Sequence, residues 1–178
     1  MADVFGDDDD VQLIPATCDS DWTLASDFLL ETVERCRRQK IPLWTHEQVC
    51  VAALKQNYHS HSLHLLRYRD IWIGCVFISF DSDVFWPDID TNSSVFFHKL
   101  AISDAYHGQG LGEKALAALG NLAKHSQRRW LRCDCHGARP RLRAFYQAFG
   151  FDLVDRKPRL GFDVARYQMR IESAHTGN

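Results

Sequence analysis

The sequence lacks a hydrophobic run long enough to cross a membrane. Its longest apolar stretch, residues 71–80, is about half of the ~20 residues that a transmembrane helix needs. It also lacks a basic excess, because 21 Lys and Arg stand against 23 Asp and Glu, for a net charge of −2. Proteins that bind phosphate backbones usually carry the opposite balance. We therefore expect neither a membrane nor a nucleic acid as a partner.

The N-terminus lacks the positive charge and apolar core of a secretion signal, since residues 1–6 are followed by a run of aspartates at 7–10. We expect a cytoplasmic protein whose residues 1–10 form a flexible acidic tail. Six cysteines are scattered through a chain long enough to bury a core without cross-links, which favours reduced thiols. No Cys, His and carboxylate set has the spacing of a zinc site, and we expect no metal.

The chain does have the composition of a globular protein, with 46% hydrophobic and 25% charged residues, and its 178 residues suit one domain over 11–174. Helical and alternating apolar patterns define the elements. We expect helices at 19–36, 45–58, 113–127 and 140–149, and strands at 11–17, 63–68, 71–80, 95–102, 129–135, 151–154 and 165–171. This order mixes antiparallel hairpins with one βαβ unit, so it predicts a single α/β or α+β layered fold.

A glycine-rich segment joins the strand at 95–102 to the helix at 113–127. Gly108, Gly110 and Gly112 occupy alternate positions, which lets the backbone turn sharply and present consecutive N–H groups at the positive end of a helix. A pyrophosphate would fit there. The spacing matches neither the dinucleotide fingerprint nor the phosphate loop of nucleotide hydrolases, so these residues alone leave a plain flexible turn as the alternative.

A second motif follows about thirty residues later, where a short helix carries Tyr146 and ends in Gly-Phe. The two motifs together resemble the GNAT superfamily of N-acetyltransferases, whose acetyl-CoA loop reads Arg/Gln-x-x-Gly-x-Gly/Ala. The resemblance covers roughly residues 63–171. It implies a mixed, mostly antiparallel central sheet flanked by helices on both faces. His107 departs from the family pattern, because it stands where Arg or Gln is usual.

The resemblance also implies acetyl-CoA as the cosubstrate. Backbone N–H groups of the glycine loop would hold its pyrophosphate, and the preceding strand would lend its backbone to the pantetheine arm. Because these contacts come from the backbone, His107 weakens the match without removing it. The implied binding residues are Leu100, Ala101, Ile102, His107, Gly108, Gln109, Gly110, Leu111, Gly112 and Glu113.

Acyl transfer to an amine needs a base for the amine and an acid for the departing thiolate. The resemblance implies Tyr146 as the acid, and a phenol of reference pKa near 10 can protonate a thiolate of about 8.5. His98 is the candidate base, because it lies on the strand that enters the glycine loop and titrates near neutral pH. Asp134, on the next strand, could orient the amine or relay a proton. A buried aromatic at 146 and a structural histidine at 98 are the alternatives.

The acceptor is expected to contact the first two helices, the segment 81–91 and the last hairpin around 158–163. In 81–91, aspartates surround two aromatic residues and would suit a cationic or sugar-like amine. The predicted substrate contacts are Phe85, Trp86, Asp88 and Asp134. The chain is similar to small bacterial acetyltransferases, some of which act on antibiotics, and this implies an aminoglycoside-type acceptor such as kasugamycin, with a role in antibiotic resistance. A protein or peptide N-acetyltransferase and a noncatalytic acyl-CoA-binding sensor remain open, and the resemblance is compatible with a homodimer.

Overall fold

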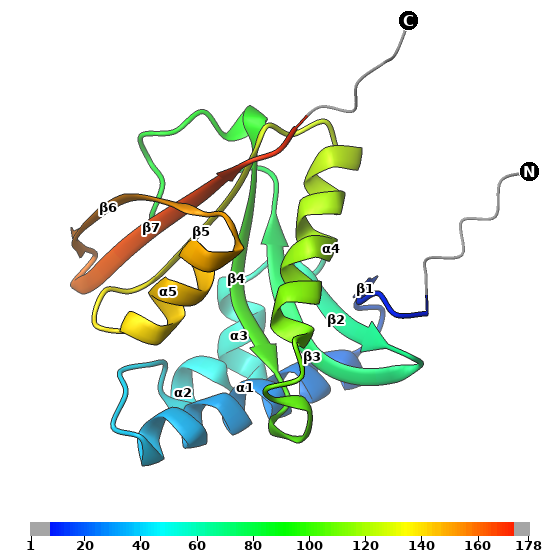
Figure 1. Cartoon of the computed structure of the whole chain (residues 1–178). Helices are drawn as coiled ribbons and strands as arrows, with labels where there is room; N and C mark the ends of the chain where they lie inside the picture. The colour runs from blue at the N-terminus through cyan, green and yellow to red at the C-terminus, as the bar shows by residue number, and fades with distance from the viewer. Residues whose placement is uncertain (1–7, 173–178) are drawn as a thin grey trace, which may run out of the picture.

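The computed structural model describes residues 8–172 and contains one seven-stranded sheet in the order β1-β2-β3-β4-β5-β7-β6 (Figure 1). The strands are β1 (Gln12–Pro15), β2 (Leu63–Tyr68), β3 (Ile71–Ser79), β4 (Ser94–Ile102), β5 (Trp130–His136), β6 (Asp152–Arg159) and β7 (Phe162–Arg170). The helices are α1 (Asp19–Arg38), α2 (His46–Val49), α3 (Val51–Asn57), α4 (Leu111–His125) and α5 (Pro140–Phe149). Short 3₁₀ turns occupy Thr91–Ser93 and Asp104–Tyr106. Neighbouring strands are antiparallel except β4 and β5, which confirms the predicted mixed, mostly antiparallel sheet.

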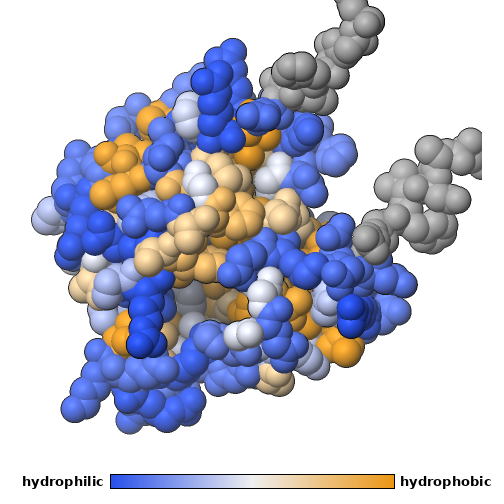
Figure 2. Space-filling view, viewed as in Figure 1, coloured by the Kyte–Doolittle hydropathy of each residue, from blue (hydrophilic) through white to orange (hydrophobic). Residues whose placement is uncertain are grey.

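Two hydrophobic cores lie on opposite faces of this sheet. Helices α1, α2 and α3 pack on one face, where Leu29 and Phe77 are fully buried. Helices α4 and α5 pack on the other, against Phe97 and Leu131. Figure 2 shows hydrophobic and weakly polar residues in the middle of this second face, over α4, framed by hydrophilic residues. The apolar residues that recur with helical spacing are therefore buried against the sheet, on both of its faces. Among residues 8–172, no helix is both long and apolar enough to span a bilayer.

The helix predicted over 45–58 is two helices, because the backbone of Cys50 is extended. The predicted capping box is present, since the Gln48 N–H donates to Thr45 Oγ1 at 3.3 Å and the Thr45 N–H donates to Gln48 Oε1 at 3.0 Å. The carbonyl of Val49 accepts a hydrogen bond from the Ser26 hydroxyl of α1 at 2.7 Å, which satisfies it outside the helix. This tertiary contact explains a break that the local sequence does not signal.

Strand β6 is longer than predicted, because its charged residues pair with β7 instead of forming a loop. Arg156 donates to Asp163 at 2.7 and 3.0 Å, and the two strands turn tightly at Leu160 and Gly161, both of positive φ. The strand lies at the sheet edge with most of its side chains exposed. A polar edge strand has little apolar alternation, so the sequence pattern missed its second half.

The segment just before β1 is held by ion pairs. Asp9 accepts hydrogen bonds from the Tyr68 hydroxyl at 2.7 Å, from Arg69 at 2.8 Å and from Lys114 of α4 at 3.0 Å. These donors hold the pKa of Asp9 below its usual range. This part of the tail predicted as flexible is therefore anchored, while residues 1–7 lie outside the described part of the chain.

Strands β4 and β5 pair only at their beginnings, over Ser94 to Phe96 and Trp130 to Arg132, and then diverge. On the other side of β4, Gly74 of β3 lies so close that a Cβ would overlap the carbonyl oxygen of Ala101. The register between β3 and β4 is irregular at this point, and Lys99 takes a left-handed backbone conformation with φ +49°. The sheet therefore opens between β4 and β5 where the candidate site lies.

Candidate active site

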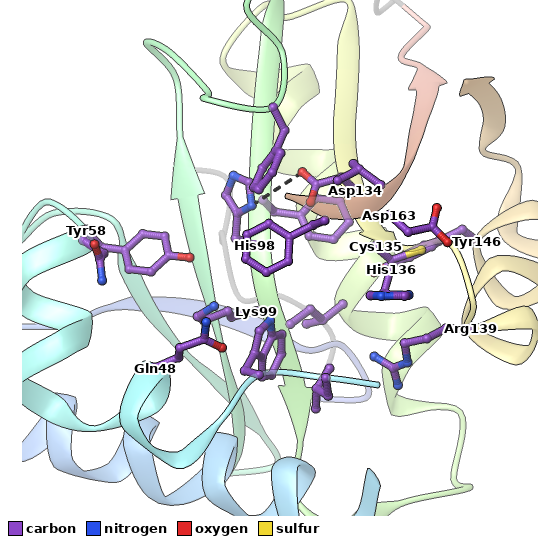
Figure 3. Close-up of a pocket in the computed structure, with 18 residues that line it drawn as sticks. Gln48, Tyr58, His98, Lys99, Asp134, Cys135, His136, Arg139, Tyr146 and Asp163 are labelled. Carbon is purple, nitrogen blue, oxygen red and sulfur yellow. Dashed lines mark ion pairs between the residues drawn. The ribbon is translucent and has the colours of Figure 1, made fainter. Parts of the chain in front are cut away.

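A cleft of about 410 Å³ fills the gap between the diverging strands (Figure 3). Five of the predicted site residues line this cleft. His98, Asp134, Tyr146 and Phe85 are predicted catalytic or substrate-binding residues, and Leu100 is a predicted cofactor-binding residue. The other lining residues come from the α2–α3 region, β4, β5 and β7: Leu43, Trp44, Gln48, Asn57, Tyr58, Phe97, Lys99, Cys135, His136, Arg139, Phe162, Asp163 and Val164. The fold thus brings together residues that are far apart in the sequence.

His98 lies between two carboxylates. Its Nε2 atom contacts Asp83 Oδ2, and its Nδ1 atom lies 3.8 Å from Asp134 Oδ2. Burial alone would lower the pKa of His98, but the hydrogen bond and charge of Asp83, helped by Asp134, outweigh it and raise the pKa. Burial also raises the pKa of Asp134 to about 6. The two groups act on each other's charge, and a carboxyl with a raised pKa beside an imidazole suits proton transfer.

One oxygen of Asp134, Oδ2, is buried and has no hydrogen-bond partner among residues 8–172. Asp83, His98 and Asp134 also form a group whose ligand atoms lie within 4.8 Å of one another, as a metal site would require. However, His98 Nε2 and Asp83 already satisfy each other by a hydrogen bond. The unpartnered oxygen of Asp134 therefore fits a hydrogen-bond donor on a bound molecule better than it fits a metal.

Asp83 was missed by the sequence analysis, which put weight on other residues of the same loop. Asp83 Oδ1 accepts a hydrogen bond from the Phe85 N–H at 2.8 Å. The loop that follows is held by Arg166 of β7, whose side chain is 2% exposed. Arg166 donates to both carboxylate oxygens of Asp88 at 2.6 and 3.2 Å, and to Asp155 of β6 at 2.7 and 2.9 Å. It also donates to the carbonyl of Phe85 at 3.2 Å. These bonds hold the loop against β6 and β7 with Asp83 turned toward His98.

The structure corrects two predicted substrate contacts, because Trp86 and Asp88 do not line the cleft. Trp86 is 1% exposed and its ring lies 4.5 Å from the Arg166 guanidinium. Asp88 is occupied by the ion pair with Arg166, which lowers its pKa to about 2. Trp86 and Asp88 therefore stabilise the loop through their contacts with Arg166. An aromatic residue beside aspartates looks the same in sequence whether it faces a ligand or a buried arginine.

Tyr146 combines burial with access to the cleft. Its ring packs 6.2 Å from Phe97 and 5.7 Å from Tyr167, and the residue is 5% exposed. Burial raises the pKa of Tyr146 well above its usual range, so its hydroxyl keeps the proton at neutral pH. A group that must donate a proton has to hold it first, and this environment supplies that condition.

Lys99 is a second residue that the sequence analysis missed. Its Nζ atom lies 4.5 Å from the centre of the Trp44 ring and 5.8 Å from that of Tyr58. Burial lowers the pKa of Lys99 to about 8, although the charge of Asp134 opposes this shift. Figure 3 shows Lys99, Gln48 and Tyr58 on one side of the cleft, and His136, Arg139 and Asp163 on the other. No sequence motif marks this lysine, because a positive φ in a strand cannot be read from the residue type.

The glycine loop has the geometry expected of an anion site. Gly108 and Gly110 have φ of +77° and +74°, and helix α4 begins directly after them. The first N–H groups of a helix have no acceptor within it, so they are free to bind an anion. His107, Gln109 and Glu113 are exposed around this turn, whereas Ala101 is buried in the core between β3 and α1.

The loop is held from the other side of the sheet by α1. Glu31 accepts hydrogen bonds from the Ser103 hydroxyl at 2.9 Å and from the Asp104 N–H at 2.8 Å. Arg35 contacts the Asp104 carboxylate. Phe145 of α5 lies against Gly112, where a Cβ would come within 3.1 Å of its ring. Contacts from two helices therefore fix the direction in which the N–H groups of the loop point.

This arrangement is that of an acetyltransferase of the GNAT class. The chain belongs to that family, since the model of the acetyltransferase (GNAT) domain matches residues 45–153. Over 84 residues it is 27% identical to the uncharacterized N-acetyltransferase YesJ of Bacillus subtilis, a match that covers 47% of this chain and 43% of YesJ.

Solved structures share the fold at low sequence identity. A GNAT acetyltransferase from Listeria monocytogenes is 16% identical, with a TM-score of 0.71 over 89% of this chain and 94% of that one. AAC(6')-Ib, solved in complex with paromomycin and acetyl-CoA, is 17% identical, with a TM-score of 0.68 over 91% of this chain and 94% of its own. These similarities confirm the predicted fold class.

Proposed function

We propose that the protein is an acetyl-CoA-dependent N-acetyltransferase that acts on a primary amine of a small polar molecule. The observation that supports this most is the divergence of β4 and β5. It brings His98, Asp134 and Tyr146 into one cleft, next to the strand that leads to the glycine loop. Membership of the GNAT family and the acetyl-CoA in the structure of AAC(6')-Ib support the choice of cosubstrate.

The predicted cofactor residues keep their roles in this proposal. The N–H groups from Gly108 to Gly112 would hold the pyrophosphate, and the backbone from Leu100 to Ile102 would hold the pantetheine arm. Leu100 lines the cleft, and β4 ends at Ile102, just before the loop. Acetyl-CoA supplies the activated acetyl group as a thioester.

The reaction then needs two proton transfers, one at each end of the cleft. His98, held by Asp83, accepts a proton from the amine as the new N–C bond forms, and Asp134 stabilises the amine through its unpartnered oxygen. The C–S bond breaks and Tyr146 donates its proton to the departing sulfur. His98 releases the amine proton to solvent and Tyr146 takes up one proton from solvent, so charge and protons balance.

The narrower proposal for the acceptor is an aminoglycoside-type amine, of which kasugamycin is an example. The fold of AAC(6')-Ib and the place of Phe85 in the cleft support it. Two cationic side chains on the cleft wall, Lys99 and Arg139, weigh against a polycation there. Antibiotic resistance as a role depends on this narrower proposal.

The test is thiol release from acetyl-CoA with a panel of aminoglycosides, polyamines, arylalkylamines, amino acids and short peptides. We expect turnover with one amine class, and we expect Tyr146→Phe to reduce kcat by about a hundredfold or more while the Kd for acetyl-CoA stays nearly constant. Tyr167→Phe is the matched control, because it removes a hydroxyl from the same core outside the cleft.

Equal losses of kcat and acetyl-CoA affinity in Tyr146→Phe would remove this residue as the acid. Tight acetyl-CoA binding without turnover of any small amine would overturn the proposed function. The remaining hypotheses would then be a peptide N-acetyltransferase and a noncatalytic acyl-CoA-binding sensor.

A further inference from the structure

Lys99 places an amine in the cleft, and the charge of Asp134 acts on this amine from a distance. Within residues 8–172, the Nζ atom of Lys99 takes part in no ion pair of 4.0 Å or less and in no hydrogen bond, so only burial and more distant charges act on it. Its neighbours are the rings of Trp44 and Tyr58. A cation–π contact compensates only part of the loss of water around a charge. The site is therefore incomplete without an anion.

The surroundings of Lys99 also offer hydrogen-bond donors. Gln48 lines the same wall, and its Oε1 atom is occupied by the Thr45 N–H at 3.0 Å. This assignment leaves the two N–H groups of the Gln48 amide free to donate to a bound molecule. An ammonium group beside a free amide donor, between two aromatic walls, is suited to an oxyanion.

The wall formed by Lys99, Gln48, Trp44 and Tyr58 lies in the part of the site where the acceptor is proposed to bind, which we call the acceptor half. Trp44 and Tyr58 pack with the α1–α3 core, whereas the glycine loop leads into α4 on the opposite face of the sheet. The left-handed φ of Lys99 places it in the irregular part of β4, where its amine reaches these two rings. The anion that Lys99 meets is thus distinct from the pyrophosphate at the glycine loop.

The acceptor half therefore presents two unpartnered groups of opposite charge. In the described part of the chain, the buried Oδ2 of Asp134 has no hydrogen-bond donor and the amine of Lys99 has no hydrogen-bond acceptor. We propose that Lys99 is an anion-binding residue that selects an acceptor carrying a carboxylate as well as the reacting amine. The acceptor class is then an amino carboxylic acid, with its amine at Asp134 and its carboxylate at Lys99 and Gln48.

This inference rests on the proposed acetyltransferase activity, and it replaces the aminoglycoside-type acceptor with an amino carboxylic acid. A polyamine or an aminoglycoside would place a further cation beside Lys99, where like charges repel. The aromatic residues Trp44, Tyr58, Phe85 and Phe162 that line the cleft favour an apolar side chain beside the amine and carboxylate of the acceptor. An aromatic amino acid is accordingly the first probe.

The experiment compares L-phenylalanine with 2-phenylethylamine, which lacks only the carboxylate. We expect kcat/KM to be about ten- to a hundredfold higher for the amino acid, as a charge-assisted hydrogen bond provides. Lys99→Met should abolish this preference, so that the ratio of kcat/KM for the two amines falls to about one in the variant. Lys99→Arg should retain part of it. Lys55→Met is the control, because Lys55 pairs with Asp19 outside the cleft.

Binding of N-acetyl-L-phenylalanine, followed by calorimetry, tests the anion site without turnover. Binding by the wild type that is lost in Lys99→Met supports the anion site. If this result is found but no amine is acetylated, the proposed function fails and the anion site stands. Equal kcat/KM for the two amines, or equal binding by wild type and Lys99→Met, would overturn it. An acetylated Lys99 after incubation with acetyl-CoA alone would also overturn it, since the amine would then be an acceptor itself.

Discussion

The proposed site has two halves that are built in different ways: the glycine loop, called the glycine half, and the cleft between β4 and β5, called the acceptor half. The glycine half consists of backbone: two residues of positive φ, the first turn of α4 and the end of β4. The acceptor half consists of side chains from α2, α3, β4, β5 and the loop before β4. The sequence marks the glycine positions of the first half, whose binding role stays a prediction, whereas it singled out only some side chains of the second half. Backbone geometry is encoded locally by glycines, but a side-chain site depends on which segments the fold brings together.

The largest effect should come from removing the base in the acceptor half. We expect His98→Ala to reduce kcat/KM by about 10²- to 10⁴-fold and to remove the acidic limb of its pH profile. His64→Ala, on β2 outside the cleft, is the control. An intact acidic limb in His98→Ala would transfer the base role to Asp134 or to water.

A large loss of stability should follow from breaking the clamp that holds the acceptor half. We expect Arg166→Ala to lower the free energy of unfolding by about 3 kcal/mol, because two carboxylates lose a buried partner. Arg37→Ala should change it by less than about 1 kcal/mol, since its pair with Glu34 is exposed. Chemical denaturation measures both, and similar losses would contradict a clamp.

The same clamp predicts an acid transition. Arg166 lowers the pKa of Asp88 to about 2 and lowers that of Asp155, so their contribution to stability is present above the unfolded pKa near 4. It is lost as the pH falls from there toward 2. In Arg166→Ala the contribution is already absent, so stability should depend less on pH in this window.

In the glycine half, Gly110→Val should weaken acetyl-CoA binding by about tenfold, because a β-branched residue disfavours the φ of +74° by roughly 1–2 kcal/mol. The space around Gly110 is open, so a steric clash is not the cause. Gly120→Ala, inside α4, should leave the Kd unchanged. Unchanged acetyl-CoA affinity in Gly110→Val would show that the pyrophosphate lies elsewhere.

The smallest effect should be a shift along the pH axis. Asp83 raises the pKa of His98, so kcat/KM in the wild type should fall as the pH drops through a value above the usual pKa of about 6.5. Asp83→Asn removes that charge, and the acidic limb should move to lower pH. A limb that stays in place would mean that Asp83 does not act through His98.

The sequence predicted helix and strand positions well because their apolar residues recur with a clear period. It did not indicate the break at Cys50, which depends on a hydrogen bond from Ser26, or the second half of β6, whose pairing is carried by charged residues. Among the acidic residues of 81–91, it could not separate Asp83, which faces His98, from Asp88, which faces Arg166. That choice depends on a partner 78 residues further along the chain.

The close approach of Gly74 to β4 has a consequence for mutational scanning of this protein. Alanine is normally the mildest probe of a position, because it only removes atoms. At residue 74 alanine adds the one atom for which there is no room, and the atom that it meets belongs to a backbone that cannot rotate away. A scan of single substitutions should therefore show intolerance at this codon that does not depend on the size or polarity of the new residue.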